Sequence, residues 1–223
     1  MLSHYSAHSL EQQLSQITLH GFCVMDNFLT QATILALANE ITVLNDATQL
    51  HKAGTGRENA IVNKHLRGDS IYWLHEADAS IAQQTYFKHM EVLRLSLNQH
   101  LYLGLFALES HLALYPMGAG YKKHIDRFKA RNLQQQPQQP LRQISCILYL
   151  NQHWLEKDGG HLRLYLNPKE ANSPLNILQQ DITQLDISPI GGRLVMFLSD
   201  TFYHEVLPTS KDRMSLTGWF LTR

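Results

Sequence analysis

The chain has 223 residues, of which 44% are hydrophobic, and its 19 basic and 19 acidic residues cancel to a formal net charge of zero. This length and apolar fraction predict one folded domain with its own core and exclude a wholly disordered chain. A neutral chain has no general electrostatic attraction for nucleic acid or an anionic membrane, so neither is expected as a partner.

The cysteines and the N-terminal residues indicate an intracellular protein. Cys23 and Cys146 lie far apart in apolar surroundings, which favours two reduced, buried thiols in a cytoplasmic protein over a disulfide. The N-terminal stretch has no basic start followed by an apolar run, so we expect no signal peptide. No apolar stretch is long enough to span a bilayer. A monomer is the default expectation.

The first half of the chain, residues 1–103, is predicted to be largely helical. Residues 10–17 indicate a short helix, "FCVMDNF" alternates like a strand, and Thr30 can cap a helix that runs to about residue 44. Residues 80–103 predict a long amphipathic helix. The apolar faces of these two longer helices are formed by Ile34, Leu37 and Ile41, and by Tyr86, Met90, Leu93, Leu97 and Leu101.

Between these helices, residues 48–69 lose all periodicity and carry Gly54, Gly56 and Gly68. A loop of this length inside a compact domain is usually functional or mobile. The "SIYWL" stretch that follows it returns to a strand pattern, in which Trp73 is interpreted as a core anchor.

The second half, residues 104–223, changes character to many short β-like segments separated by Gly, Pro and polar breaks. Strands that follow a run of helices predict an α+β domain built on a β-sandwich or barrel, with the helices packed outside. The Gln- and Pro-rich insert at 134–140 is interpreted as a surface loop. We therefore expect a single domain over 1–223.

The "YKKHIDRF" stretch places His124 and Asp126 two positions apart. Residues i and i+2 of a strand point to the same face, so these side chains converge without any special folding. Alone, the pair is a weak signal. Two later features strengthen it: His204 follows the apolar strand "GGRLVMFL", and Arg213 begins the strand "RMSLTGWF" on a face that also holds Trp219. An arginine on an inward face requires a carboxylate or phosphate partner.

Two histidines and one carboxylate are the ligand set of non-haem Fe(II) oxygenases. The order His-x-Asp, distant His, then Arg is that of 2-oxoglutarate-dependent oxygenases, in which a fixed cation must hold the far carboxylate of the keto acid. Arginine suits this task because its fork binds a carboxylate through two parallel hydrogen bonds.

The motifs "LYPMGAGYKKHID", "RQISCILYLN", "GGHLRLY", "FLSDTFYHEV" and "RMSLTGWF", together with the upstream "HGFCVMDNFL" and "RGDSIYWL", resemble the 2-oxoglutarate and Fe(II)-dependent prolyl 4-hydroxylases. The similarity is to the hypoxia-sensing type and its bacterial relatives, and it spans most of the chain. It implies a double-stranded β-helix (jelly-roll, cupin-like) core with supporting N-terminal helices. It also implies Fe(II), 2-oxoglutarate and O2, ascorbate as reductant, and a proline-containing protein or peptide substrate.

The resemblance further implies a role for each matching residue. His124, Asp126 and His204 would bind iron and carry the catalysis. The implied 2-oxoglutarate residues are Arg213, Tyr149, Tyr115 and Thr217, and the implied substrate residues are Arg142, Trp219 and Arg67. The loop of about 51–67 would fold over the bound peptide.

Two rival interpretations remain open at this point. The same oxygenase machinery could act on a different side chain, a free amino acid or a small metabolite. Alternatively, the chain could be a catalytically silent module that binds 2-oxoglutarate, although the intact set of His124, Asp126, His204 and Arg213 favours an enzyme. A nucleic-acid repair oxygenase is disfavoured by the zero net charge.

Overall fold

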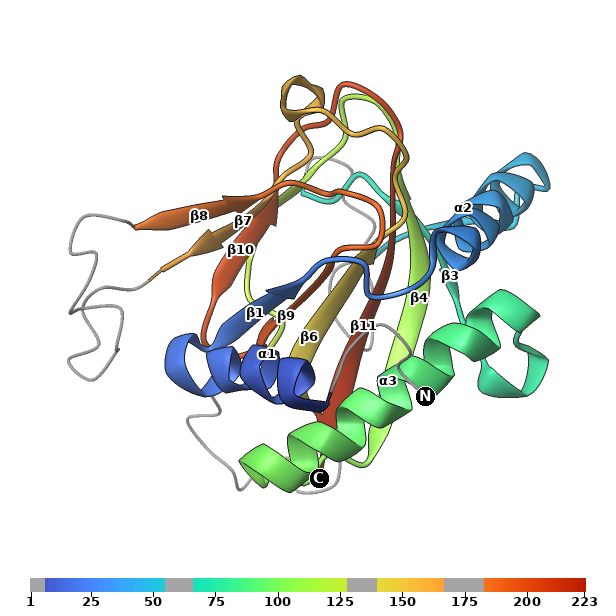
Figure 1. Ribbon diagram of the computed structural model, residues 1–223. Helices are drawn as coiled ribbons and strands as arrows, with labels where there is room; N and C mark the ends of the chain where they lie inside the picture. Colours follow the sequence, from blue (N-terminus) through green and yellow to red (C-terminus); the bar gives the residue numbers. More distant parts are fainter. Residues whose placement is uncertain (1–6, 55–65, 128–139, 167–182) are drawn as a thin grey trace.

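The computed structural model describes residues 7–54, 66–127, 140–166 and 183–223, and it folds into two antiparallel sheets with helices on one side (Figure 1). In spatial order the larger sheet contains β1 (Phe22–Met25), β9 (Leu194–Leu198), β6 (Leu141–Tyr149), β11 (Arg213–Thr222), β4 (Ala107–Tyr115), β3 (Ser70–Trp73) and β2 (His51–Lys52). The smaller sheet contains β5 (Tyr121–His124), β10 (Tyr203–Val206), β7 (Leu162–Tyr165) and β8 (Gln184–Ile187). The predicted α+β jelly-roll class is confirmed.

Three helices cover the outer face of the larger sheet: α1 (Ala7–His20), α2 (Gln31–Asp46) and α3 (Ile81–Leu101) (Figure 1). Thr30 caps α2 by accepting a hydrogen bond from the backbone N–H of Thr33, as the sequence predicts, and Ser80 caps α3 in the same way. Two 3-10 turns, η1 (Glu76–Asp78) and η2 (Glu156–Asp158), complete the described elements. None of the described helices is long and apolar enough to cross a membrane.

Apolar clusters on each side explain why both faces of the larger sheet are buried. On its outer face, even-numbered residues of β6 and β11 such as Cys146, Leu216 and Phe220 pack against the apolar faces of the helices. On its inner face, Ile147 and Tyr149 pack against residues of the smaller sheet. The period-2 alternation of a strand thus separates the residues that support the fold from those that face the other sheet.

One glycine allows the closest approach on the helix side of the larger sheet. A Cβ atom at Gly218 would lie 2.5 Å from Ser110 Oγ, 2.8 Å from the carbonyl oxygen of Glu109 and 3.2 Å from the Tyr86 hydroxyl. Tyr86 and Ser110 are themselves hydrogen-bonded at 3.1 Å. Gly218 therefore permits this buried polar pair to sit directly against β11.

Three details differ from the sequence prediction. Helix α3 ends two residues earlier than expected because Tyr102 adopts a left-handed conformation (φ 52°). Strand β5 ends at His124, so Asp126 lies just beyond the strand. Trp73 is 42% exposed and is not a core anchor, because β3 lies near the edge of the sheet. Most of the predicted covering loop, at 55–65, and almost all of the Gln- and Pro-rich insert lie outside the described residues.

Candidate metal centre and anion-binding cleft

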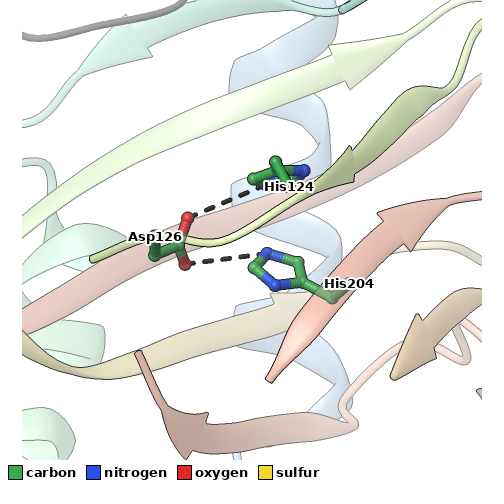
Figure 2. A group of neighbouring side chains, drawn as sticks. All are labelled: His124, Asp126 and His204. Atoms are coloured by element: carbon green, nitrogen blue, oxygen red, sulfur yellow. Dashed lines mark ion pairs between the residues drawn. The ribbon is translucent and has the colours of Figure 1, made fainter. Parts of the chain in front are cut away.

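Three metal-ligating side chains converge between the sheets: His124 at the end of β5, Asp126 just after it, and His204 on β10 (Figure 2). His204 pairs directly with His124 in the antiparallel ladder, which places the two imidazoles side by side with ring centroids 4.1 Å apart. Nε2 of His124 lies 3.7 Å from Asp126 Oδ1, and Nε2 of His204 lies 3.7 Å from Oδ2. Ligand atoms about 2 Å from one ion lie about 3–4 Å apart, so these separations fit a shared metal.

Backbone carbonyl groups orient both imidazoles. Nδ1 of His124 donates to the carbonyl oxygen of Lys122 at 2.8 Å, and Nδ1 of His204 donates to that of Phe202 at 3.1 Å. With Nδ1 as the donor, each Nε2 carries the lone pair that a metal requires. The strand backbone thus selects the metal-binding tautomer of both rings.

Asp126 is held by two donors from the larger sheet. Ser145 Oγ donates to Asp126 Oδ2 at 2.6 Å, and the indole Nε1 of Trp219 donates to the same oxygen at 2.8 Å. Ser145 and Trp219 face each other across the β6–β11 ladder, so the two donors come from one level of the sheet. Within the described part of the chain, Oδ1 accepts no hydrogen bond and stays available as a ligand.

The charge states of these groups suit a cation. Burial, followed by the neighbouring His204, lowers the pKa of His124 to about 3, which keeps its imidazole neutral. Burial acts to raise the pKa of Asp126, but the two histidines and the hydrogen bonds from Ser145 and Trp219 lower it overall. A neutral imidazole and an ionised carboxylate are the protonation states from which a metal binds without displacing protons.

A buried cation lies behind this site. The Arg213 side chain at the start of β11 is 1% exposed, and it forms no ion pair with any described residue. Its Nε donates to the carbonyl oxygen of Gly160 at 2.9 Å, and its Cζ lies 5.0 Å from the ring centres of both Tyr115 and Tyr149. An unpaired buried guanidinium is costly unless an anion binds it.

Two further observations fit a carboxylate bound at Arg213. Among the residues that the structure describes, the buried Tyr149 hydroxyl has no hydrogen-bond partner of normal geometry, and a phenol beside a guanidinium is a donor that a carboxylate can accept from. Gly160 lets the guanidinium approach, because a Cβ there would lie 3.1 Å from Arg213 Cδ and 3.2 Å from the Trp154 ring. Burial raises the pKa of Tyr149, so its hydroxyl keeps its proton.

A cleft of about 980 Å³ is lined both by the metal ligands and by Arg213, and its wall also includes the exposed Trp73. Nine of the ten predicted site residues line it: His124, Asp126, His204, Arg213, Tyr115, Thr217, Arg142, Trp219 and Arg67. Tyr149 lies beside Arg213 and not on the cleft wall. The odd-numbered residues of β11 face this cleft, as the strand alternation predicts.

Arg67 lines the cleft with its guanidinium already engaged. Its Nε and Nη2 donate to Asp69 at 2.7 and 2.9 Å, and Asp69 is fully buried. Its Cζ lies 4.8 Å from the ring centre of Tyr121, which in turn stacks on the His124 ring at 3.6 Å. Arg67 therefore supports the wall beside a metal ligand, and its predicted contact with substrate stays a prediction.

Three residues of the site were given no role from the sequence: Ser145, Glu109 and His111. Ser145 shares a face with Tyr149 in the β6 alternation, which was the available signal for an inward side chain. Glu109 and His111 lie on the cleft face of β4, opposite Trp219 and Thr217 of β11. The same signal was available for them, because residues 109 and 111 share a strand face with the predicted site residue Tyr115.

Comparison with known proteins agrees with this geometry. A model of the 2OG-Fe(II) oxygenase superfamily matches residues 110–221. The human protein named prolyl hydroxylase EGLN3 is 30% identical over 214 residues, which cover 90% of this chain and 78% of that protein. The crystal structure of a Pseudomonas putida prolyl-4-hydroxylase superposes with a TM-score of 0.77 at 36% identity, covering 96% of this chain and 99% of that one.

A prolyl hydroxylase solved with a hypoxia-inducible factor peptide fragment from Trichoplax adhaerens has a TM-score of 0.75 at 23% identity, covering 99% of this chain and 95% of that one, and supports the fold. The family match over half of the chain, and the similarity to the human relative along most of both sequences, are independent of the site geometry. The chain therefore belongs to the 2OG-Fe(II) oxygenase superfamily and is an iron- and 2-oxoglutarate-dependent dioxygenase.

Proposed function

We propose that the protein hydroxylates prolyl residues of a protein substrate at C4. The observation that carries this proposal is the combination of the His124–Asp126–His204 cluster with the unpaired Arg213 guanidinium, in a chain whose relatives are named prolyl hydroxylases. When bound, Fe(II) with 2-oxoglutarate and O2 supplies the oxidation that converts a substrate C–H to C–OH and the keto acid to succinate and CO2.

The residues of the chain position and enclose the reactants. His124, Asp126 and His204 would hold the metal, while Ser145 and Trp219 keep the Asp126 carboxylate in place. Tyr115 and Thr217, which line the cleft, would border the bound diacid.

Arg213 and Tyr149 would bind the far carboxylate of 2-oxoglutarate, which satisfies a guanidinium without an ion pair and a hydroxyl without a partner. This anchor fixes one end of the co-substrate and leaves its keto acid end free to reach the metal. The binding energy at Arg213 is thus used for orientation, which is the main contribution that a protein makes in such chemistry.

Proline suits the outer part of the cleft. The indole rings of Trp73 and Trp219, 6.4 Å apart, and the His111 ring between them form an aromatic wall. The proline ring is compact and has no N–H donor that burial would leave unpaired. We propose that Arg142 and Trp219 flank the target residue there. We further propose ascorbate as the reductant, a cytoplasmic location and a monomeric state.

The decisive experiment is turnover on a panel of proline-containing peptides. Purified protein with Fe(II), ascorbate and 2-oxoglutarate should form succinate and add one oxygen to proline, and the His124→Ala variant should do neither. Equal inertness of the wild type and His124→Ala across the panel would contradict the prolyl assignment. Succinate formed only with free amino acids or small metabolites would assign the same machinery to a different substrate.

A further inference from the structure

An ion pair spans the outer end of the cleft. Glu109 on β4 and Arg142 on β6 lie on opposite sides of β11, and the Arg142 Nε donates to Glu109 Oε1 at 2.6 Å. Glu109 is the direct partner of Trp219 in the β4–β11 ladder. The two charged side chains therefore meet across the middle strand, over the indole that holds Asp126.

The ion pair with Glu109 and the contact with Trp219 fix the orientation of the Arg142 guanidinium. Its Cζ lies 3.6 Å from the Trp219 ring centre, so one face of the guanidinium is covered by the indole. Its Nε is occupied by Glu109, whereas its two Nη groups have no hydrogen-bond partner among the described residues. Both Glu109 and Arg142 line the cleft, with side chains 34% and 20% exposed. Arg142 thus offers an edge of N–H donors toward the space in which a substrate would lie.

The other arginines that line the outer cleft are already engaged. Arg67 is bonded to Asp69 through two nitrogens, and Arg127 is bonded to Asp200 and Gln143. Trp73 and His111 form an aromatic wall beside Trp219. Apart from the Asp126 carboxylate, the charge that the described residues present beside Trp219 is therefore that of the Glu109–Arg142 pair.

We infer that Glu109 is a specificity-determining residue, which positions Arg142 to bind a neutral backbone carbonyl beside the target proline and disfavours an acidic side chain at that place. The inference rests on the proposed function, since it requires a peptide in the cleft. A carboxylate on the substrate would meet the Glu109 carboxylate, and the Arg142 charge that could attract it is already neutralised. A backbone carbonyl needs only the free Nη donors.

A structural brace is a weaker explanation for the pair. Partly exposed ion pairs contribute little to stability. The position of the Glu109–Arg142 pair in the cleft therefore points to a role in substrate binding. The chain also contains a matched ion pair outside the cleft, formed by Glu91 and Arg94 of α3 at 2.7 Å. Glu91→Gln neutralises the acidic member of this second pair on α3, which packs on the outer face of the larger sheet and does not line the cleft.

The test compares two peptides that differ only in having Gln or Glu next to the target proline. For the wild type, kcat/KM should favour the Gln peptide. Glu109→Gln, which is nearly isosteric, should shift the Glu-to-Gln ratio of kcat/KM about fivefold or more toward the acidic peptide. Arg142→Gln, which leaves Glu109 without its partner, should shift the ratio in the opposite direction. Glu91→Gln should leave the ratio unchanged.

Shifts of opposite sign separate this role from a structural one, because a loosened cleft would weaken both peptides alike. Turnover with an unchanged ratio in Glu109→Gln would overturn the inference and leave the proposed function standing. Failure of the wild type to hydroxylate any proline peptide would overturn the proposed function and this inference together.

Discussion

Arg213 and Tyr149 lie together beside the cleft, with the guanidinium carbon 5.0 Å from the phenol ring centre, and among the described residues the Tyr149 hydroxyl has no hydrogen-bond partner of normal geometry. The two residues come from neighbouring strands, β11 and β6. A buried cation without an ion pair and a buried phenol without a regular partner, among the described residues, suit the far carboxylate of 2-oxoglutarate that we propose binds here.

Removing this anchor should weaken 2-oxoglutarate binding selectively. We expect Arg213→Ala to raise the KM for 2-oxoglutarate by about 10- to 100-fold, since it deletes a charge-assisted bidentate contact. Tyr149→Phe deletes one hydroxyl and should raise the KM by about three- to tenfold. Succinate formation measured against 2-oxoglutarate concentration checks both. Metal affinity should stay near that of the wild type, and a KM unchanged in Arg213→Ala would show that the anchor lies elsewhere.

The two donors to Asp126 should control metal affinity from outside the ligand set. Ser145→Ala removes the 2.6 Å hydrogen bond to Asp126 Oδ2, and Trp219→Phe removes the 2.8 Å bond while keeping an aromatic ring. Each change should weaken metal binding by about tenfold, because such supporting contacts orient the ligand. Titration with Mn(II) followed by calorimetry measures the effect. Ser210→Ala, at an exposed position, is the control, and equal affinities in all three variants would contradict the prediction.

His111 should make the metal-free protein sensitive to mild acid. Burial, followed by the nearby Arg67 and Arg142, lowers its pKa well below 6.5, against a smaller opposing effect of Asp126. Below pH 6.5 the unfolded chain therefore binds a proton at this residue that the folded chain does not, and stability is lost as the pH falls. At pH 5.5 this loss amounts to about 1.4 kcal/mol.

Replacing His111 with Gln should remove that share of the pH dependence. Between pH 7.5 and 5.5, His111→Gln should lose about 1.4 kcal/mol less stability than the wild type in urea unfolding of the chelator-treated protein. The exposed His75→Gln serves as the control. Parallel stability curves for the wild type and His111→Gln would show that the buried imidazole is protonated in the folded state.

Gly218→Ala should destabilise the fold by about 1–3 kcal/mol, because the new methyl group overlaps Ser110 Oγ and the Glu109 carbonyl oxygen. Adding Ser110→Ala removes the closest of these atoms and should recover part of the loss. Thermal unfolding of the single and double variants measures both effects. If the double variant is no more stable than Gly218→Ala alone, the backbone contact with Glu109 is the dominant strain.

The sequence predicts the site well where short-range periodicity decides it. The alternation in β11 and β6 separates Arg213 and Tyr149 from Met214 and Leu148, and the His-x-Asp spacing brings two ligands together. The resemblance to the family motifs then identifies the distant His204 as the third ligand. The N-cap Thr30 is likewise a local feature, because its partner is only three residues away.

Contacts that depend on strand register could not be predicted. Ser145 reaches Asp126, and Glu109 reaches Arg142, across strands whose pairing no local pattern encodes. Trp73 was misplaced for a related reason, since whether a tryptophan is buried depends on how near its strand lies to the edge of the sheet. The end of α3 depends on the left-handed Tyr102, a conformation that its residue type does not indicate.

The site draws on both layers of the jelly roll. The two histidines of the candidate metal centre belong to the smaller sheet, through β5 and β10, whereas Arg213 and Tyr149 belong to the larger one, through β11 and β6. A bound diacid that contacts both the metal and Arg213 would therefore link the two sheets to each other. Binding of 2-oxoglutarate would then make the two-sheet core more rigid before any peptide binds. The product succinate lacks the keto group, so it would no longer link the two sheets.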